Sequence, residues 1–119
     1  MTNFYGYEIE LFAIEVLTEI NGVSVRSGVD LRGGFWLIVH VDDDPGHLVW
    51  ICAPVSSRAL SEVAAGRAAV RDAVRHTVTG TVEVVTIVRG RAVPDRCLLC
   101  SDIPSELLPL DDFHVAPAA

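Results

Sequence analysis

The chain has 119 residues, is half hydrophobic and carries a formal charge of −7. This length and composition favour one domain with a sizeable core rather than a disordered chain. The negative charge argues against general binding to nucleic acid, because such binding depends on neutralising phosphates. We expect a single domain over residues 1–115 with a frayed tail at 116–119. We also expect a protein partner, for which a basic surface is one option.

All nine basic residues are arginines, and with many Ala, Val and Gly this is typical of a GC-rich bacterial genome. Cysteines occur in an odd number, and the N-terminus has neither a basic segment nor a long apolar run. This pattern indicates reduced thiols in a cytosol. No apolar stretch reaches the roughly 18–20 residues that span a bilayer. The sequence therefore predicts a cytoplasmic protein that does not bind membranes.

Residues 8–20 are rich in Ile, Val, Leu and Phe, but they alternate with polar residues only in parts. A strand and a helix both fit this pattern. Asn21-Gly22 follows directly, and Asn-Gly between apolar runs is a strong hairpin signal. The run at 23–31 alternates cleanly, and Gly33-Gly34 then turns the chain. We therefore expect strands on both sides of Asn21-Gly22.

Residues 35–41 (FWLIVHV) and 48–53 (LVWICA) are apolar at nearly every position. Such runs are typical of central strands that are covered on both faces. Pro45-Gly46 lies between them, and this dipeptide fits the two central positions of a type II turn. The sequence predicts a buried hairpin here.

Two short helices should follow. Ser56 or Ser57 can cap a helix over 57–65, and Gly66 can end it. The second helix is expected at 68–76, with Val70, Ala73 and Val74 as its apolar face.

Residues 81–88 are β-branched and predict another strand, and residues 92–100 could return as an edge strand with Pro94 near its start. Residues 103–109 predict a single helical turn. Strands grouped apart from helices define an α+β fold. We expect an antiparallel β-meander with two short helices packed on one face, then one or two further strands.

Several segments resemble, in pattern and order, a bacterial domain family of unknown function. They are the strand WLIVHVDDD, the strand and capped helix VWICAPVSSRALSEVAAG, the short helix GRAAVRDAV and the late element DIPSELLP. Together they cover most of residues 35–110. The N-terminal part departs from the resemblance, since Asn21-Gly22 stands where a polar-Gly-Pro turn is expected. The resemblance implies no established activity and no site residues.

Cys97 and Cys100 have a CxxC spacing, which can serve redox chemistry or zinc binding. No second pair of ligands accompanies them, so buried structural thiols are the favoured interpretation. If Asp42 faces His47 across the hairpin, His40 lies on the same face and the three could share a metal. A polar strand end is the more ordinary interpretation, and we expect no metal and no cofactor.

Catalytic signatures are missing from the sequence. There is no nucleophile elbow, no Gly-rich phosphate loop and no HExxH motif. Ser56, Ser57 and Cys52 are available as nucleophiles, but the sequence gives none of them a base. An enzyme is therefore the least favoured class, and no catalytic residue is predicted.

Two charged features are the candidate partner-binding residues. Arg67, Arg71 and Arg75 are spaced to form one basic stripe on the second helix, which could grip a carboxylate or a phosphate or could be a solvated face. Asp42-Asp43-Asp44 forms an acidic hairpin tip, which could contact a basic partner or serve solubility. Calcium binding is not expected there, because calcium loops alternate their ligands.

The sequence favours a non-catalytic acidic protein–protein interaction module, such as an accessory, inhibitor or immunity-type protein of a bacterium. The alternative is a small-ligand-binding or sensing domain with a pocket between sheet and helices. This hypothesis rests on the negative net charge and on the missing catalytic motifs, since a fold alone does not imply a function.

Overall fold

The computed structural model describes residues 3–20, 23–44, 46–109 and 112–115, with the backbone alone at positions 20, 23 and 42–44. Its strands are β1 Asn3–Tyr5, β2 Glu10–Ile20, β3 Val23–Val29, β4 Phe35–Asp44, β5 His47–Val55, β6 Thr81–Val88, β7 Arg91–Ala92 and β8 Arg96–Leu99. Its helices are α1 Ser57–Ala64 and α2 Val70–Arg75, with 3-10 turns η1 Cys100–Asp102 and η2 Ser105–Leu107.

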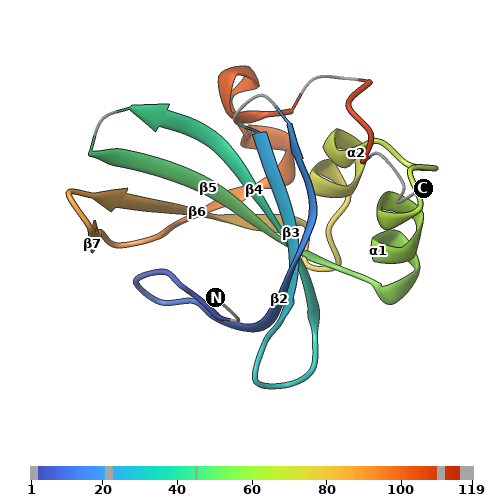
Figure 1. Cartoon of the computed structure of the whole chain (residues 1–119), viewed down its shortest axis with the longest axis horizontal. Coiled ribbons are helices and arrows are strands. Elements are labelled where there is room, and N and C mark those ends of the chain that lie inside the picture. Colours follow the sequence, from blue (N-terminus) through green and yellow to red (C-terminus); the bar gives the residue numbers. More distant parts are fainter. Residues whose placement is uncertain (1–2, 21–22, 45, 110–111, 116–119) are drawn as a thin grey trace.

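All eight strands belong to one antiparallel sheet. The spatial order from β1 to β7 follows the chain order, and β8 also pairs with β6, along residues 81–84. The strands and the helices occupy separate parts of the chain, so the predicted α+β class and the antiparallel meander are confirmed. Figure 1 shows the sheet curling, with α1 and α2 together at one side.

The ambiguous segment 8–20 forms strand β2, which confirms the preferred interpretation. The pairing of β2 with β3 has register shifts between Phe12 and Glu15 and between Val16 and Thr18. Such irregularities shift the side chains relative to the partner strand, which explains why the alternation of this segment is broken. Asn21-Gly22 lies outside the described residues, and the strands on both sides of it pair antiparallel as expected.

The central hairpin is longer than predicted, because the ladder continues to Asp44, which pairs with His47. Gly46 has the positive φ (77°) that the expected turn requires, and Pro45 lies outside the described residues. Leu37 and Ile38 are adjacent in β4 and both fully buried. Since neighbouring strand residues point to opposite faces, this strand is covered on both sides, as its apolar run predicted.

Both helices are present, and the caps of α1 are those expected. Ser56 Oγ accepts a hydrogen bond from Ala59 N at 3.1 Å, and Gly66 follows the helix with φ 76°. A left-handed backbone at this position is easy for glycine and ends the helix. The second helix is shorter than the predicted 68–76, because the backbone of Ala69 is extended. Its apolar residues are buried as predicted: Val70, Ala73 and Val74.

The predicted return strand at 92–100 is divided into β7 and β8. Pro94 lies in the gap, and proline cannot donate to a sheet ladder. Leu98 of β8 still pairs with Val82 of β6, so the segment does return along the sheet edge. The predicted helical turn at 103–109 is the 3-10 turn η2.

Two hydrophobic clusters lie on opposite faces of the central strands. The first combines strand residues such as Leu37 and Ile51 with the helix residues Val63, Val70 and Val74. The second combines Phe4, Leu11, Ile38, Trp50, Cys52 and Val85 from strands of both halves of the sheet. None of the helices in the described part of the chain is long and apolar enough to cross a membrane.

The curl of the sheet is fastened by Asp95, between β7 and β8. Its Oδ1 and Oδ2 accept hydrogen bonds from Tyr7 N at 3.2 Å and Glu8 N at 2.9 Å, in the link between β1 and β2. Gly6 lies so close by that a Cβ there would sit 3.0 Å from Val85 Cγ2. One carboxylate thus ties the N-terminal edge of the sheet to its far end.

Replacing Asp95 with Ala should loosen this connection. We expect faster amide hydrogen exchange at Tyr7 and Glu8 and a loss of about 1 kcal/mol in the free energy of unfolding, since two charge-assisted hydrogen bonds are removed at an exposed site. Exchange measured by NMR, with Asp102→Ala as the control at an exposed acid, tests this. Unchanged exchange at Tyr7 and Glu8 would show that Asp95 does not hold the link.

Candidate functional site

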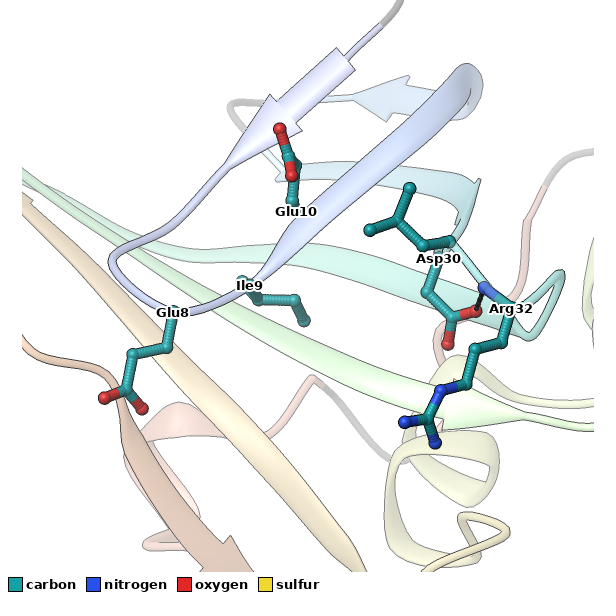
Figure 2. Close-up of a pocket in the computed structure, with 6 residues that line it drawn as sticks. Glu8, Ile9, Glu10, Asp30 and Arg32 are labelled. Atoms are coloured by element: carbon teal, nitrogen blue, oxygen red, sulfur yellow. Dashed lines mark hydrogen bonds between the residues drawn. The ribbon is translucent and has the colours of Figure 1, made fainter.

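An open hollow of about 350 Å³ lies between the β1–β2 link and the β3–β4 turn. It is lined by Glu8, Ile9, Glu10, Asp30, Leu31 and Arg32, and we call it the acidic hollow. Figure 2 shows Glu8, Ile9 and Glu10 on one wall and Asp30 and Arg32 on the facing wall. Three carboxylates and one guanidinium therefore surround a space with an apolar residue on each wall.

The turn at residues 30–34, which we call the Asp30 turn, is held by the side chain of its first residue. Asp30 Oδ1 accepts hydrogen bonds from Arg32 N and Gly34 N, each at 2.9 Å. Asp30 Oδ2 accepts one from Trp36 Nε1 at 3.0 Å. Backbone hydrogen bonds from Gly33 N to Asp30 O and from Asp30 N to Gly34 O, both 3.0 Å, complete the set. This is the geometry that favours Asp at the start of a turn.

The Asp30 turn presents an apolar side chain to solvent. Leu31 is 80% exposed, the highest exposed fraction among the large hydrophobic side chains in the described part of the chain. Gly33 has φ 82°, a conformation that glycine adopts without strain. The hydrogen bonds that fix the backbone thus hold Leu31 outward, away from any core.

The same contacts keep Asp30 charged. The hydrogen bond from the Trp36 indole lowers the pKa of the Asp30 carboxyl, and the Gly34 amide lowers it further. Hydrogen bonds to the charged form of a carboxyl favour ionisation. The Asp30 turn therefore keeps both its shape and its negative charge at neutral pH.

The Asp30 turn was not predicted, although the sequence contains a signal for it. Gly33-Gly34 predicted only a simple reversal of the chain, and Asp30 was given no role. An Asp three residues before Gly33, with Leu31 between them, could have marked an Asp-stabilised turn with an apolar tip.

The predicted arginine stripe is wrong as a stripe on one helix. Arg67 precedes α2, because Gly66 and the extended Ala69 separate the two helices, and its Nε lies 2.8 Å from Glu62 Oε2. Arg71 is half-buried, with Nη1 3.5 Å from the Pro109 carbonyl oxygen. Arg75 is exposed. The three arginines thus have three different environments, and whether any binds a partner stays a prediction.

The acidic tip also differs from its prediction. Asp42, Asp43 and Asp44 are strand residues of β4, and their backbones pair with Val49, Leu48 and His47. The two-residue link at 45–46 is short enough for the ladder to continue through them. Their side chains lie outside the described part of the structure, so their role in partner binding stays a prediction.

The proposed His40–Asp42–His47 arrangement is wrong in register. His47 pairs with Asp44, and a shift lies between His40 and Asp42. His40 pairs instead with Trp50. Among the described residues, no group of three or more His, Cys, Asp or Glu is placed to hold a metal ion.

The prediction of buried thiols is wrong for Cys97, which is exposed. Its neighbour Leu98 packs against the first cluster, so Cys97 points to the other side of this edge strand. Cys100 is half-buried and its thiol donates to the Val74 carbonyl oxygen at 3.4 Å, with Thr77 Oγ1 at 3.3 Å. A thiol engaged in this way has a structural role.

A second hollow of about 320 Å³ lies along the two helices. Its lining residues are Ser56, Arg58, Ala59, Glu62, Val63, Ala68, Asp72, Ala73 and His76. All of them come from α1, α2 and their flanking residues. The lining of this hollow combines apolar side chains with charged side chains of both signs. A smaller hollow of about 210 Å³ does lie between strands β2–β4 and Leu60 of α1, where the ligand-binding alternative places its pocket.

The surroundings of Glu83 raise the pKa of its carboxyl. In the ladder it lies between Cys52 of β5 and Cys97 of β8. Burial raises the pKa of the Glu83 carboxyl; a hydrogen bond with Cys97 opposes this, and Asp95 and Glu8 raise the pKa further. Burial also raises the pKa of the Cys52 thiol, which keeps that thiol neutral. This row of side chains favours uncharged forms.

Comparison with known proteins gives no relative. No family model matches the chain, and neither the curated proteins nor the solved structures contain a significant match.

Replacing Glu83 with Gln should stabilise the protein at neutral pH. The folded pKa is raised, so folding disfavours the ionised carboxyl, and this cost is full above the folded pKa and absent below the unfolded value near 4.5. The melting temperature of Glu83→Gln should exceed that of wild type at pH 7–8, and the difference should shrink as the pH falls through this window. Thermal melts over pH, with the exposed Glu106→Gln as control, test this. A constant difference at all pH values would contradict the assignment.

Proposed function

We propose that this protein is a non-catalytic protein–protein interaction module, and that it binds through the Asp30 turn and the acidic hollow beside it. The observation that carries the proposal is the combination in the Asp30 turn: a backbone fixed by side-chain and backbone hydrogen bonds, and an apolar tip residue, Leu31, that is 80% exposed. Stability of the fold alone does not call for a large apolar side chain in that place.

The backbone of the Asp30 turn is already fixed before binding, and this favours affinity for a partner. A loop that orders on binding loses conformational entropy, and a loop already held in place avoids that cost. The surroundings add further contact area: Tyr7 in the β1–β2 link is exposed, as is Tyr5 in edge strand β1. Tyrosine is enriched in interfaces, because it offers a large apolar body and a polar end. We infer that Leu31 inserts into a shallow pocket of the partner while the tyrosines contact its rim.

The charge of the hollow supports a partner with a basic surface. Glu8, Glu10 and the ionised Asp30 outnumber Arg32, and the whole chain carries −7. Charge of one sign around a binding surface increases the association rate of an oppositely charged partner and makes it salt-dependent. Asp42, Asp43, Asp44 and the exposed Arg75 remain candidates for further contacts in this proposal.

Two further parts of the proposal concern the setting of the module. We propose that α1 and α2 cover one face of the sheet, which is supported by the buried helix residues sharing a cluster with Leu37 and Ile51. We also propose a cytoplasmic location, which is supported by the three unpaired cysteines, since disulfides are rare in that compartment.

The test is a capture experiment with the intact chain as bait in an extract of its native host. Leu31→Ser removes the apolar tip, and Leu99→Ser is the matched control, because Leu99 is 55% exposed on the edge strand β8. We expect Leu31→Ser to weaken capture at least about tenfold, the loss of more than 1 kcal/mol that a central contact typically carries. Leu99→Ser should capture the partner as wild type does.

A third variant tests the pre-organisation itself. Asp30→Asn keeps Leu31 but leaves one side-chain oxygen in place of two. That oxygen cannot accept hydrogen bonds both from the turn amides and from the Trp36 indole, so the turn should loosen and capture should weaken. Equal capture by wild type, Leu31→Ser and Asp30→Asn, with all three folded, would refute this surface.

A further inference from the structure

Arg26 of β3 is laid against a tryptophan on the face of the sheet that carries the second cluster. Its Cζ lies 5.3 Å from the ring centroid of Trp50, a cation–π distance. Its Nε donates to Ser24 Oγ at 3.1 Å. The His40 ring lies 4.6 Å from the Trp50 ring, and Phe4 meets Trp50 edge-on at 5.6 Å. The guanidinium thus lies over the indole ring and is hydrogen-bonded through one of its nitrogens.

This cluster has more hydrogen-bond donors than acceptors. Among the described residues, the ion pair found is Arg67 with Glu62, so no carboxylate there pairs with Arg26. The hydrogen bond to Ser24 engages Nε and leaves the two terminal nitrogens of Arg26. The indole N–H of Trp50, a residue that is only 9% exposed, has no acceptor in the described part of the chain. Buried polar groups normally have a partner, which can be protein, water or a ligand, so the Trp50 N–H is a donor available to a bound group.

The position of Arg26 allows a small molecule to reach it. Arg26 is half-buried, and Val16, which faces it across the β2–β3 ladder, is exposed. None of these residues lines the acidic hollow, so the cluster is separate from the surface proposed for protein binding. Glu19 lies diagonally from Arg26 on the same face, since it pairs with Ser24.

We propose that Arg26, stacked on Trp50, is a binding site for a small oxyanion, a free carboxylate or phosphate. The terminal nitrogens of a guanidinium form a fork that matches two oxygens of such a group, and a fork already fixed in orientation loses little entropy on binding. His40, in contact with the same indole, adds a second nitrogen-bearing ring beside Trp50. The guanidinium binds the anionic group, and the exposed Val16 lies beside any apolar part that the ligand carries.

The experiment is a titration followed by NMR of the indole and arginine side-chain N–H signals. The intact protein is titrated with sodium phosphate, sodium acetate and sodium chloride, at constant pH and matched ionic strength. We expect the Trp50 indole and Arg26 Nε–H signals to move and saturate with phosphate or acetate, while chloride leaves them in place. The Trp36 indole, which is bonded to Asp30, serves as the internal reference. Phosphate and acetate distinguish the two kinds of oxyanion.

Variants decide whether Arg26 is the receptor. Arg26→Gln should reduce the affinity at least about tenfold, a typical effect of removing one charge-assisted contact. Arg96→Gln, on exposed β8, should leave it unchanged, and Glu19→Gln should increase it by removing a nearby negative charge. If Arg26→Gln fails to fold, Arg26→Lys keeps the charge without the fork and should still weaken binding. Equal shifts with chloride, no saturating shift with either oxyanion, or undiminished binding by the Arg26 variant would overturn the proposal, whatever the outcome at Leu31.

Discussion

The architecture depends on the need to cover the central strands on both faces. Leu37, Ile38 and Val39 are consecutive and almost entirely buried, and two of them point one way while the third points the other. A flat sheet with two short helices leaves one of these faces in water. The second face is covered because the sheet curls until its first strands approach β6 and β8. There Asp95 holds the β1–β2 link by hydrogen bonds.

Curling has a consequence for where functional residues can lie. The first cluster, to which strand and helix residues both contribute, is closely packed, so the accessible features gather at the ends of strands and along the open part of the curl. The Asp30 turn is at one strand end, and the Arg26–Trp50 stack is on the curled face. The two differ in charge, which fits one partner with a basic surface and one small anion. The net charge of −7 indicates only the first of these two surfaces, the Asp30 turn.

The sequence predicted the longer strands, the caps of α1 and the buried face of α2, because apolar periodicity and turn residues act locally, but it did not predict β1. It could not predict the contacts of Asp95 with Tyr7 and Glu8, because these residues are far away in the chain. The arginine spacing failed for a similar reason, since it holds only if one helix continues through Arg67. Neither the Asp30 turn nor the Arg26–Trp50 stack was found from the sequence, because each needs side chains whose contacts the register of the strands decides.

The hydrogen bond between Trp36 and Asp30 joins the surface to the interior. Trp36 belongs to β4 and packs against the second cluster, while its indole N–H holds the carboxylate that shapes the turn. Indole emission is sensitive to such a neighbouring charge, so the chain carries an intrinsic fluorophore at the base of the Asp30 turn. A movement of Leu31 that displaces Asp30 should therefore change the emission of Trp36, without any added label.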